Sequence, residues 1–517
     1  MEQATLVLTN ARVHRMGASA GESEPATPDA ETVVIGDGRI LAVGDDGPGR
    51  EATTSDTKTI DLDGRTVLPG FIDAHTHLLH EGMTQVHADL ASATSREEAI
   101  ERLHTHAEQV DPEASWIIGL GFDESTWPSE TSLTRTDLDE ISASRPVAAI
   151  RVDMHTAVVN SVALNRFGDR LADEHVRTAN GKPTGVIVED ALDIIEPVTD
   201  PSRSAIRGLL TSAVDRATSL GITAVHDKVR NRHVPRAYRE LDLADELDIR
   251  VRIDYWRDFL DALDETGLVS NHGSEKVTVG AIKSFTDGSI GGRTARVSEP
   301  YRDESTDNRG QWVVEPDTFR DVVTRASEAG FQLAIHAIGD EAIDLAVDEL
   351  ARTDGPRHRI EHVELASDTA IERMAEAGIV ASMQPNFHRW ARDGGLYETA
   401  LGAERTRVSN QLHRMVEAGV PLAFGSDCMP MDPLYGIHHA VNAPSEHQSL
   451  SVTEAVRAYT SGAAFAGFDE DRLGSIDPGM CADIVVLDES PWQTPTEIET
   501  IDVALTIVDG TIVYDGR

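Results

Sequence analysis

The chain has 517 residues, of which 40% are hydrophobic, and its 89 acidic and 46 basic residues give a formal net charge of −43. This negative charge argues against nucleic acid and anionic membranes as partners, because both are themselves negative. The sequence has no apolar run of about 18 residues that would span a membrane, and its N-terminus lacks the regions of a signal peptide. We therefore expect a soluble cytoplasmic protein. Because the acidic residues are spread along the whole chain, we expect a salt-rich cytoplasm, as in a halophile.

Short β-type runs occupy both ends of the chain. Three lie at 4–14, 31–44 and 58–70, and two more follow at 481–490 and 503–517. The last run contains Asp509-Gly510 between apolar residues, which is a strong hairpin signal. Neither end has enough strands for a stable sheet of its own. The sequence therefore predicts that residues 1–66 and 469–517 pair into one composite β-sandwich domain.

Between these ends, apolar runs alternate with amphipathic helical stretches, which is typical of a parallel βα fold. Eight apolar runs lie at 70–77, 221–227, 249–256, 277–285, 331–340, 357–365, 378–387 and 420–427. Four of them follow helical stretches that close with glycine, as a left-handed C-terminal cap favours. The predicted fold class is therefore α/β, with a TIM-like (β/α)8 barrel over residues 67–468. Residues of about 78–205 would form an inserted subdomain between the first and second strands.

The triplet His-Thr-His occurs twice, and the two copies have different contexts. His75 and His77 close the first apolar run, where residues i and i+2 of a strand point to the same side. His104 and His106 lie in a stretch with helical spacing, where they would point about 200° apart. The first pair can converge on a metal ion and the second cannot.

Later runs carry further candidate ligands at their ends: Lys283, His336, His362 and Asp427. Imidazole and carboxylate groups suit Zn²⁺ or another divalent metal. Lys283 stands inside an apolar run of a chain with few lysines, and a buried ammonium is costly. It either forms a salt bridge, for instance with Asp287, or reacts with CO₂ to give a carbamate that bridges two ions.

This set, with stretches such as "LPGFIDAHTH", "IKSFTDGSIGGRTA", "GFQLAIHAIGDEAID", "RHRIEHVEL" and "GSDCMPMDPL", resembles the amidohydrolase superfamily in its two-metal form. It is most similar to the amidohydrolase-3 branch, which includes N-substituted formamide deformylases. The resemblance covers nearly the full chain and implies a barrel with a composite β-sandwich. It also implies that His75, His77 and Asp427 hold one ion, that His336 and His362 hold another, and that a carbamate on Lys283 bridges them. Whether the site holds one ion or two stays open.

The resemblance implies a metal-dependent amidohydrolase, an EC 3.5-type enzyme acting on a small molecule. Its substrate would contain a non-peptide carbon–nitrogen bond: an amide, an N-formyl group or a cyclic amide. A metal-activated water would attack the carbonyl, with Asp427 as general base and then general acid. Lactone or ester hydrolysis at the same site is one alternative, and a catalytically silent binding scaffold is another. The sequence leaves open whether the protein forms a homo-oligomer.

Several residues are candidates for contact with the substrate, and each could equally have a structural role. His226 ends the second run as a pocket residue or oxyanion donor, or as a packed histidine paired with Asp227. Arg293 follows the fourth run and could meet an anionic group of the substrate. The histidine ligands also need acceptors on their other nitrogens, for which Asp340 is a candidate. In the insertion, four residues belong to motifs that lie near the substrate in similar proteins: Trp127, Arg151, Asp153 and His155.

Overall fold

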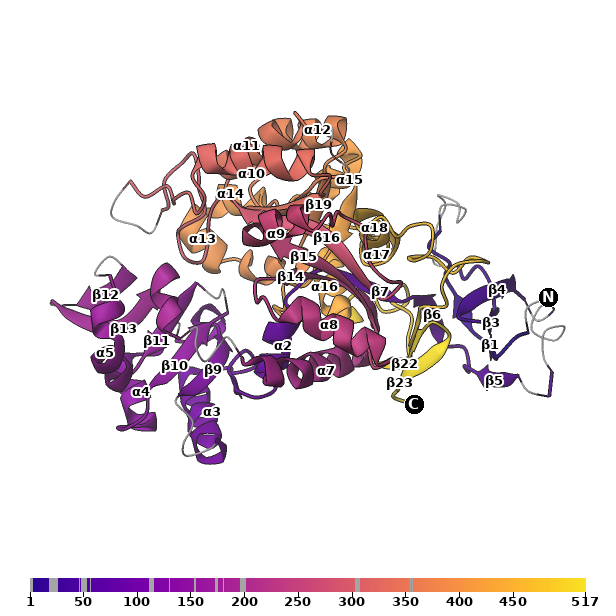
Figure 1. Ribbon diagram of the computed structural model, residues 1–517, viewed down its shortest axis with the longest axis horizontal. Coiled ribbons are helices and arrows are strands. Elements are labelled where there is room, and N and C mark those ends of the chain that lie inside the picture. Colours follow the sequence, from indigo (N-terminus) through magenta and orange to yellow (C-terminus); the bar gives the residue numbers. More distant parts are fainter. Residues whose placement is uncertain are drawn as a thin grey trace. The chain divides into compact units, whose positions relative to one another are not determined.

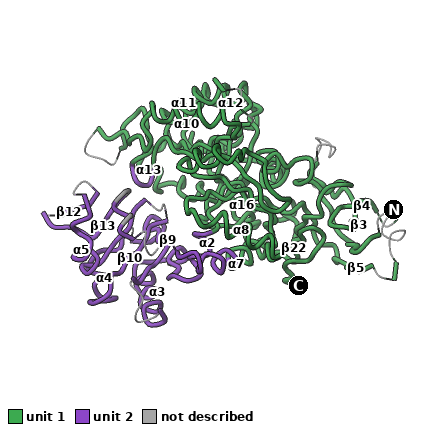
Figure 2. Tube along the Cα trace, viewed as in Figure 1, with its two compact units in different colours: residues 1–78, 213–288, 294–517 green, residues 79–212, 289–293 purple. Residues whose placement is uncertain are grey.

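The computed structural model describes residues 3–517 except 18–26, 46, 48–53, 56, 111–115, 130, 153–154, 173–174, 180, 196–200, 303–306, 354 and 356. The chain forms two compact units (Figure 2). Unit 1 comprises residues 1–78, 213–288 and 294–517, and unit 2 comprises residues 79–212 and 289–293. The predicted domain boundaries at 66, 78, 205 and 468 stay predictions.

The centre of unit 1 is an eight-stranded parallel sheet whose strands follow one another in chain order (Figure 1). Each predicted run coincides with one strand, and β14 alone extends beyond its run, by two residues: β7 (Phe71–Thr76), β14 (Ile222–Val229), β15 (Arg250–Trp256), β16 (Val277–Phe285), β17 (Leu333–Ala337), β18 (Arg359–His362), β19 (Val380–Met383) and β20 (Leu422–Phe424). The Asp427 N–H, beyond β20, donates to the His75 carbonyl at 2.7 Å, which joins the two edges. The near-closed sheet confirms the predicted barrel.

Helices connect the barrel strands, and four of them coincide with the predicted helical stretches. These are α7 (Arg203–Ser219), α10 (Pro316–Glu328), α12 (Asp368–Ala377) and α15 (Leu412–Ala418). The glycines beyond them, at 221, 330, 378 and 419, have φ values of 79°, 81°, 64° and 77°. A side chain would be strained in this left-handed conformation, so glycine ends each helix. Further helices are α8 (Val234–Leu243), α9 (Leu260–Glu265), α11 (Asp340–Leu350), α13 (Leu396–Leu401), α14 (Ala403–Arg407), α16 (Pro433–Val441), α17 (Val452–Ala458) and α18 (Ser461–Ala466).

The chain ends form two smaller sheets, as predicted. One has the order β4-β3-β1-β5 and uses β1 (Leu6–Thr9), β3 (Thr32–Gly36), β4 (Arg39–Gly44) and β5 (Lys58–Asp61). The other has the order β2-β6-β21-β22-β23 and uses β2 (Arg12–Val13), β6 (Thr66–Pro69), β21 (Ile484–Leu487), β22 (Val503–Val508) and β23 (Thr511–Asp515). One apolar core contains residues of both sheets, among them Leu8 and Val486. The predicted hairpin turns at Asp509 and Gly510, both with positive φ.

Unit 2 contains a six-stranded mixed sheet with the order β12-β13-β11-β10-β9-β8. Its strands are β8 (Ala88–Asp89), β9 (Ile117–Phe122), β10 (Val147–Arg151), β11 (Thr156–Val159), β12 (Val176–Ala179) and β13 (Lys182–Val188). Helices α3 (Arg96–Gln109), α4 (Arg135–Ile141) and α5 (Ser161–Phe167) accompany the sheet, and α2 (Leu78–Thr84) precedes it. Two apolar clusters fill this unit, which agrees with the predicted inserted subdomain.

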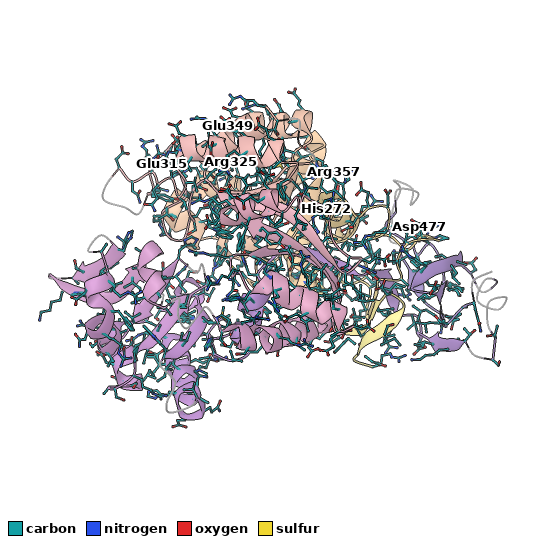
Figure 3. The ribbon with its side chains drawn as sticks, viewed as in Figure 1. His272, Glu315, Arg325, Glu349, Arg357 and Asp477 are labelled. Carbon is teal, nitrogen blue, oxygen red and sulfur yellow. The ribbon has the colours of Figure 1, made fainter. Side chains whose placement is uncertain are left out.

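Arg325 and Glu349 lie on the helical part of unit 1 (Figure 3), and both take part in ion pairs. Glu349 accepts from Arg320 at 3.1 Å and from Arg352 at 2.6 Å, and Arg325 pairs with Asp261. Exposed pairs of this kind contribute at most about 1 kcal/mol each. Across the part of the chain that the structure describes, no helix has the length and apolar character needed to cross a membrane.

Candidate metal centre

Three side chains converge at the carboxyl ends of the first and last barrel strands. His75 lies in β7, His77 follows it directly, and Asp427 lies beyond β20. The Asp427 Oδ1 atom is 3.5 Å from His75 Nε2 and 3.2 Å from His77 Nε2. One ligand atom from each residue lies within 4.8 Å of the others. Two imidazoles and a carboxylate form a donor set that fits a divalent cation such as Zn²⁺.

The other ring nitrogen of each histidine has a fixed partner. His75 Nδ1 donates to Glu361 Oε2 at 2.5 Å, and His77 Nδ1 donates to the Lys228 carbonyl at 3.2 Å. These bonds select the tautomer in which Nε2 carries a lone pair towards Asp427. Burial also lowers the pKa of His75 well below its usual value, which keeps the ring neutral. The pKa of Asp427 lies far below its usual value despite its burial, because neighbouring groups stabilise the anion, so the carboxylate is ionised.

His336 and His362 extend this cluster along the barrel rim. The ring centroid of His362 is 4.9 Å from that of His75 and 4.5 Å from that of His336. His362 Nδ1 donates to Gln384 Oε1 at 2.7 Å, and His336 Nε2 donates to the Gly288 carbonyl at 3.0 Å. The remaining ring nitrogens, Nε2 of His362 and Nδ1 of His336, are therefore the candidate ligand atoms.

The candidate acceptor Asp340 binds elsewhere: it accepts from the backbone N–H of Ser298 at 2.8 Å and from the Ser298 hydroxyl. The acceptors that hold the histidines come instead from Glu361, Gln384 and two backbone carbonyls.

Lys283 is 1% exposed, and its Nζ has no hydrogen-bond partner among the described residues. The predicted salt bridge between Lys283 and Asp287 is therefore wrong. The Asp287 carboxylate accepts instead from the backbone N–H groups of Arg296, Ile338 and Gly339. The Lys283 Nζ lies 4.9 Å from the centroid of the Phe285 ring. Burial lowers the pKa of Lys283 to about 7, against the opposing effect of Glu361 and Asp427.

Backbone strain accompanies the site. His362 has φ 74°, Val363 has φ 54°, Asp427 has φ 53° and Cys428 has φ 56°. Residues other than glycine rarely adopt this left-handed backbone conformation. Proteins tolerate its energetic cost mainly where it orients functional groups.

A network of charged residues inside the barrel supports the centre, and no sequence motif predicted it. Glu361 accepts from Arg359 Nε at 2.5 Å and from Ser382 Oγ at 2.7 Å, besides its bond with His75. Arg359 also donates to His226 Nδ1 at 2.8 Å. Strands β14 and β18 are not neighbours in the sheet, so this last contact crosses the barrel interior.

The predicted substrate contacts stay predictions, but the structure shows what these side chains touch. His226 is buried against Arg359, while Asp227 accepts from the Tyr238 hydroxyl and the Leu78 N–H, so His226 and Asp227 do not form the expected pair. Arg293 is half-buried and donates to the carbonyls of Ile290 and Gly291.

In unit 2, Trp127 is 2% exposed and its indole donates to the Ala93 carbonyl at 2.9 Å. Arg151 pairs with Glu124 at 3.0 Å, His155 is half-buried, and Asp153 lies outside the described residues.

The second triplet lies in α3, as its helical spacing predicts. Ser95 caps this helix by accepting from the Glu98 N–H, His104 is exposed, and the ring of His106 lies 6.2 Å from that of His87.

Comparison with known proteins agrees with this geometry. The family model described as "Amidohydrolase family" matches residues 58–514. Protein LONG AFTER FAR-RED 3 of Arabidopsis thaliana is 32% identical over 95% of this chain and 90% of its own length. The N-substituted formamide deformylase of Arthrobacter pascens is 27% identical over 94% of this chain and 95% of its own. The crystal structure of an uncharacterized metal-dependent hydrolase from Pyrococcus furiosus has a TM-score of 0.74 and 29% identity, and covers 94% of this chain and 99% of its own. Because the family model matches most of its length, the chain belongs to the amidohydrolase family.

Proposed function

We propose that this amidohydrolase-family protein hydrolyses a non-peptide carbon–nitrogen bond of a small molecule: an amide, an N-formyl group or a cyclic amide. The observation that carries the proposal is the convergence of His75, His77 and Asp427 at the open end of the barrel. The side chain of His77 is 33% exposed, so this end of the site is open to solvent. Similarity to a formamide deformylase over nearly the full chain supports the choice of bond.

His75, His77 and Asp427 would hold one divalent ion, and His336 and His362 would hold a second. Such a cation polarises a carbonyl group and lowers the pKa of water towards neutrality. Asp427, which is ionised, accepts the proton of the attacking water on a carboxylate oxygen and passes it to the leaving nitrogen. Glu361 and the Lys228 carbonyl hold the two imidazoles in place during these steps.

Lys283 would bridge the two ions as a carbamate. Its Nζ forms a bond with the carbon of CO₂ and releases a proton to solvent, which converts a buried amine without a partner into an anionic ligand. The test is Lys283→Ala, which should lose bound metal and regain part of it with short-chain carboxylates. Lys276→Ala is a matched control, because Lys276 pairs with Asp509 away from the site. A carbon-13 signal from labelled bicarbonate in the unmodified protein should vanish in Lys283→Ala, and metal retention by that variant would contradict the proposal.

The substrate class is tested by a screen of the metal-loaded protein in high salt. Formamides, N-acyl amines and cyclic amides should be hydrolysed, and a chelator should abolish the activity. Faster turnover of lactones or esters would favour the alternative hydrolase. Protein without tightly bound metal or chelator-sensitive activity would refute the enzyme and favour a binding scaffold.

A further inference from the structure

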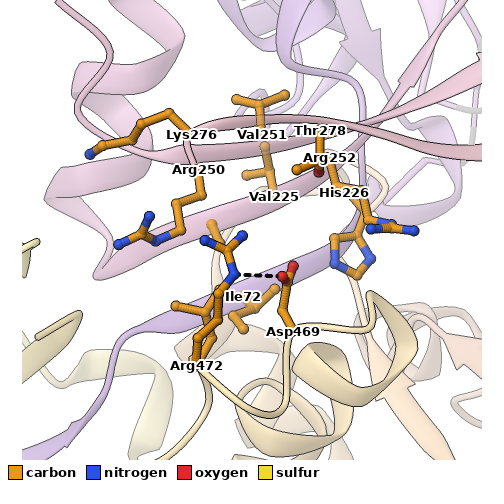
Figure 4. Close-up of a pocket in the computed structure, with 12 residues that line it drawn as sticks. Ile72, Val225, His226, Arg250, Val251, Arg252, Lys276, Thr278, Asp469 and Arg472 are labelled. Carbon is orange, nitrogen blue, oxygen red and sulfur yellow. Dashed lines mark hydrogen bonds and ion pairs between the residues drawn. The ribbon is translucent and has the colours of Figure 1, made fainter. Parts of the chain in front are cut away.

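The base of the barrel contains a cavity that is too small for a substrate. Ile72, Thr278 and Leu473 form part of its wall, together with residues of β14 and β15 (Figure 4). Its volume is about 10 Å³, which is room for about one water molecule. Contacts that select a substrate are therefore expected at the carboxyl end of the barrel, where barrel enzymes form their active sites.

Two aromatic side chains lie beside the candidate ligands at this carboxyl end. Phe285 closes β16, and its ring stacks on that of His336 with 4.5 Å between the centroids. Trp256 closes β15, and its ring centroid is 4.9 Å from that of Phe285. In the register of the sheet, Trp256 is the partner of Lys283 and Phe285 is the partner of His336. Because paired residues of neighbouring strands point to the same side, both rings face the barrel mouth with these candidate ligands.

Arg230 stands at the outer end of this aromatic wall. It follows β14 directly, and its Cζ atom lies 5.9 Å from the centroid of the Trp256 ring. It is exposed, and in the described part of the chain its guanidinium forms no hydrogen bond or ion pair. Lys228, two residues earlier, accepts from His77 Nδ1 through its carbonyl. Arg230 therefore lies within about 7 Å of chain from a group that holds a candidate ligand.

These contacts form a continuous line along the barrel rim, from His336 through Phe285 and Trp256 to Arg230. Trp256 and Phe285 are half-buried, so each keeps a surface that an apolar group can contact. A guanidinium binds a carboxylate through two parallel N–H groups. We propose that Arg230 binds a carboxylate of the substrate, and that Trp256 and Phe285 contact an apolar group between this carboxylate and the scissile bond. The assignment rests on the proposed function and narrows its substrates to N-formyl or N-acyl amines with an apolar body and an acidic end.

The charge of the chain makes such a cation necessary for an acidic substrate. The formal net charge of −43 repels an anion. Salt screens the charges of the whole surface beyond roughly 3–10 Å, whereas a guanidinium in contact with a carboxylate acts at short range. Arg293, the arginine predicted for this role, donates from Nη1 to the carbonyls of Ile290 and Gly291 in its own loop.

The first test compares two formamides of the same shape with the metal-loaded protein. 4-Formamidobenzoate carries a carboxylate, and 4-nitroformanilide carries a planar, uncharged nitro group in its place. Arg230→Gln should raise KM for the acid about 10-fold with little change in kcat, because the contact is made equally in the ground and transition states. Its KM for the nitro compound should stay near normal. Arg236→Gln is the matched control, because this exposed arginine pairs with Glu240 on a helix surface, and it should change neither value.

The outcomes separate the carboxylate site from the proposed function. An unchanged KM for the acid in Arg230→Gln, or an equal rise for the nitro compound, would overturn the carboxylate site while hydrolysis itself continues. Hydrolysis of neither compound by the unmodified protein would count against the proposed function, and the carboxylate site would fall with it.

The second test concerns the aromatic wall. Trp256→Leu should raise KM for both ring compounds and leave that for N-methylformamide near normal, because the small substrate does not reach the wall. Trp256→Phe keeps a ring and should restore much of the affinity, and the melting temperature of each variant shows whether it is folded. An equal rise for N-methylformamide, or no rise for the ring compounds, would refute the apolar contact.

Discussion

The substitution Glu361→Gln should separate the support of the metal centre from the ligands themselves. Glu361 is fully buried and accepts four hydrogen bonds, from His75, Ser382 and two nitrogens of Arg359. Although burial raises the pKa of Glu361, Arg359 and Lys228 hold it well below its usual value, so the group is ionised. Glutamine keeps the size but offers one acceptor oxygen and places an amide nitrogen against donors.

Two losses should follow. Arg359 would remain buried without a carboxylate, and breaking a buried ion pair in this way costs about 3–5 kcal/mol of unfolding free energy. His75 would lose the acceptor that fixes its tautomer, and loss of such a partner weakens metal binding roughly 10–100-fold. Denaturant unfolding at fixed metal concentration measures the first effect, and competition with a chelating indicator on the folded protein measures the second.

Asp483→Asn is the matched control. It also removes a buried carboxylate from a two-pronged arginine pair, here with Arg250, but it lies away from the metal centre. It should therefore cost similar stability and leave metal affinity unchanged. Normal metal affinity in Glu361→Gln, or an equal loss of affinity in Asp483→Asn, would refute the supporting role of Glu361.

Three further predictions concern the ligand, the second triplet and acid stability. Asp427→Asn should abolish turnover while the circular dichroism spectrum and unfolding midpoint stay near normal, and near-normal turnover would contradict its role in proton transfer. His104→Ala and His106→Ala should leave metal content unchanged by elemental analysis, and a loss would show that the helical triplet binds metal. Burial lowers the pKa of His358 from 6.5 to about 4, so the stability it contributes is present above pH 6.5 and is lost as the pH falls towards 4, by about 3 kcal/mol. In His358→Asn, whose amide oxygen can still accept from the Leu333 N–H, this part of the acid destabilisation should disappear, and an unchanged pH profile would refute it.

The barrel could be predicted because its signals are local. Each strand is an apolar run, and a parallel strand buried on both faces needs little else. The glycines after α7, α10, α12 and α15 mark helix ends for the same local reason. The prediction that His75, His77 and Asp427 lie together needed only one rule, which is that the parallel strands of a barrel end at the same rim. Their approach to within 4.8 Å agrees with that rule.

The supporting residues were missed although their signal was present. Arg359 and Glu361 stand inside an apolar run, as Lys283 does, and that pattern alone marks a buried charge in need of a partner. The sequence could not name the partners, because Arg359 meets His226 across the barrel, 133 positions away along the chain. The same limit applies to Lys283: Asp287 is near in sequence, but the backbone N–H groups of Arg296, Ile338 and Gly339 occupy it.

The interior of this barrel differs from the layers of branched apolar side chains that usually fill such a fold. Here ion pairs such as Arg359–Glu361 and Lys228–Asp254 occupy it. Because a buried charge is stable only when paired, cations that lack a protein acceptor indicate where an external group binds. In the described part of the barrel interior, Lys283 has this property at the metal end. The cost of a buried cation without an acceptor therefore favours a carbamate on Lys283 at the metal end.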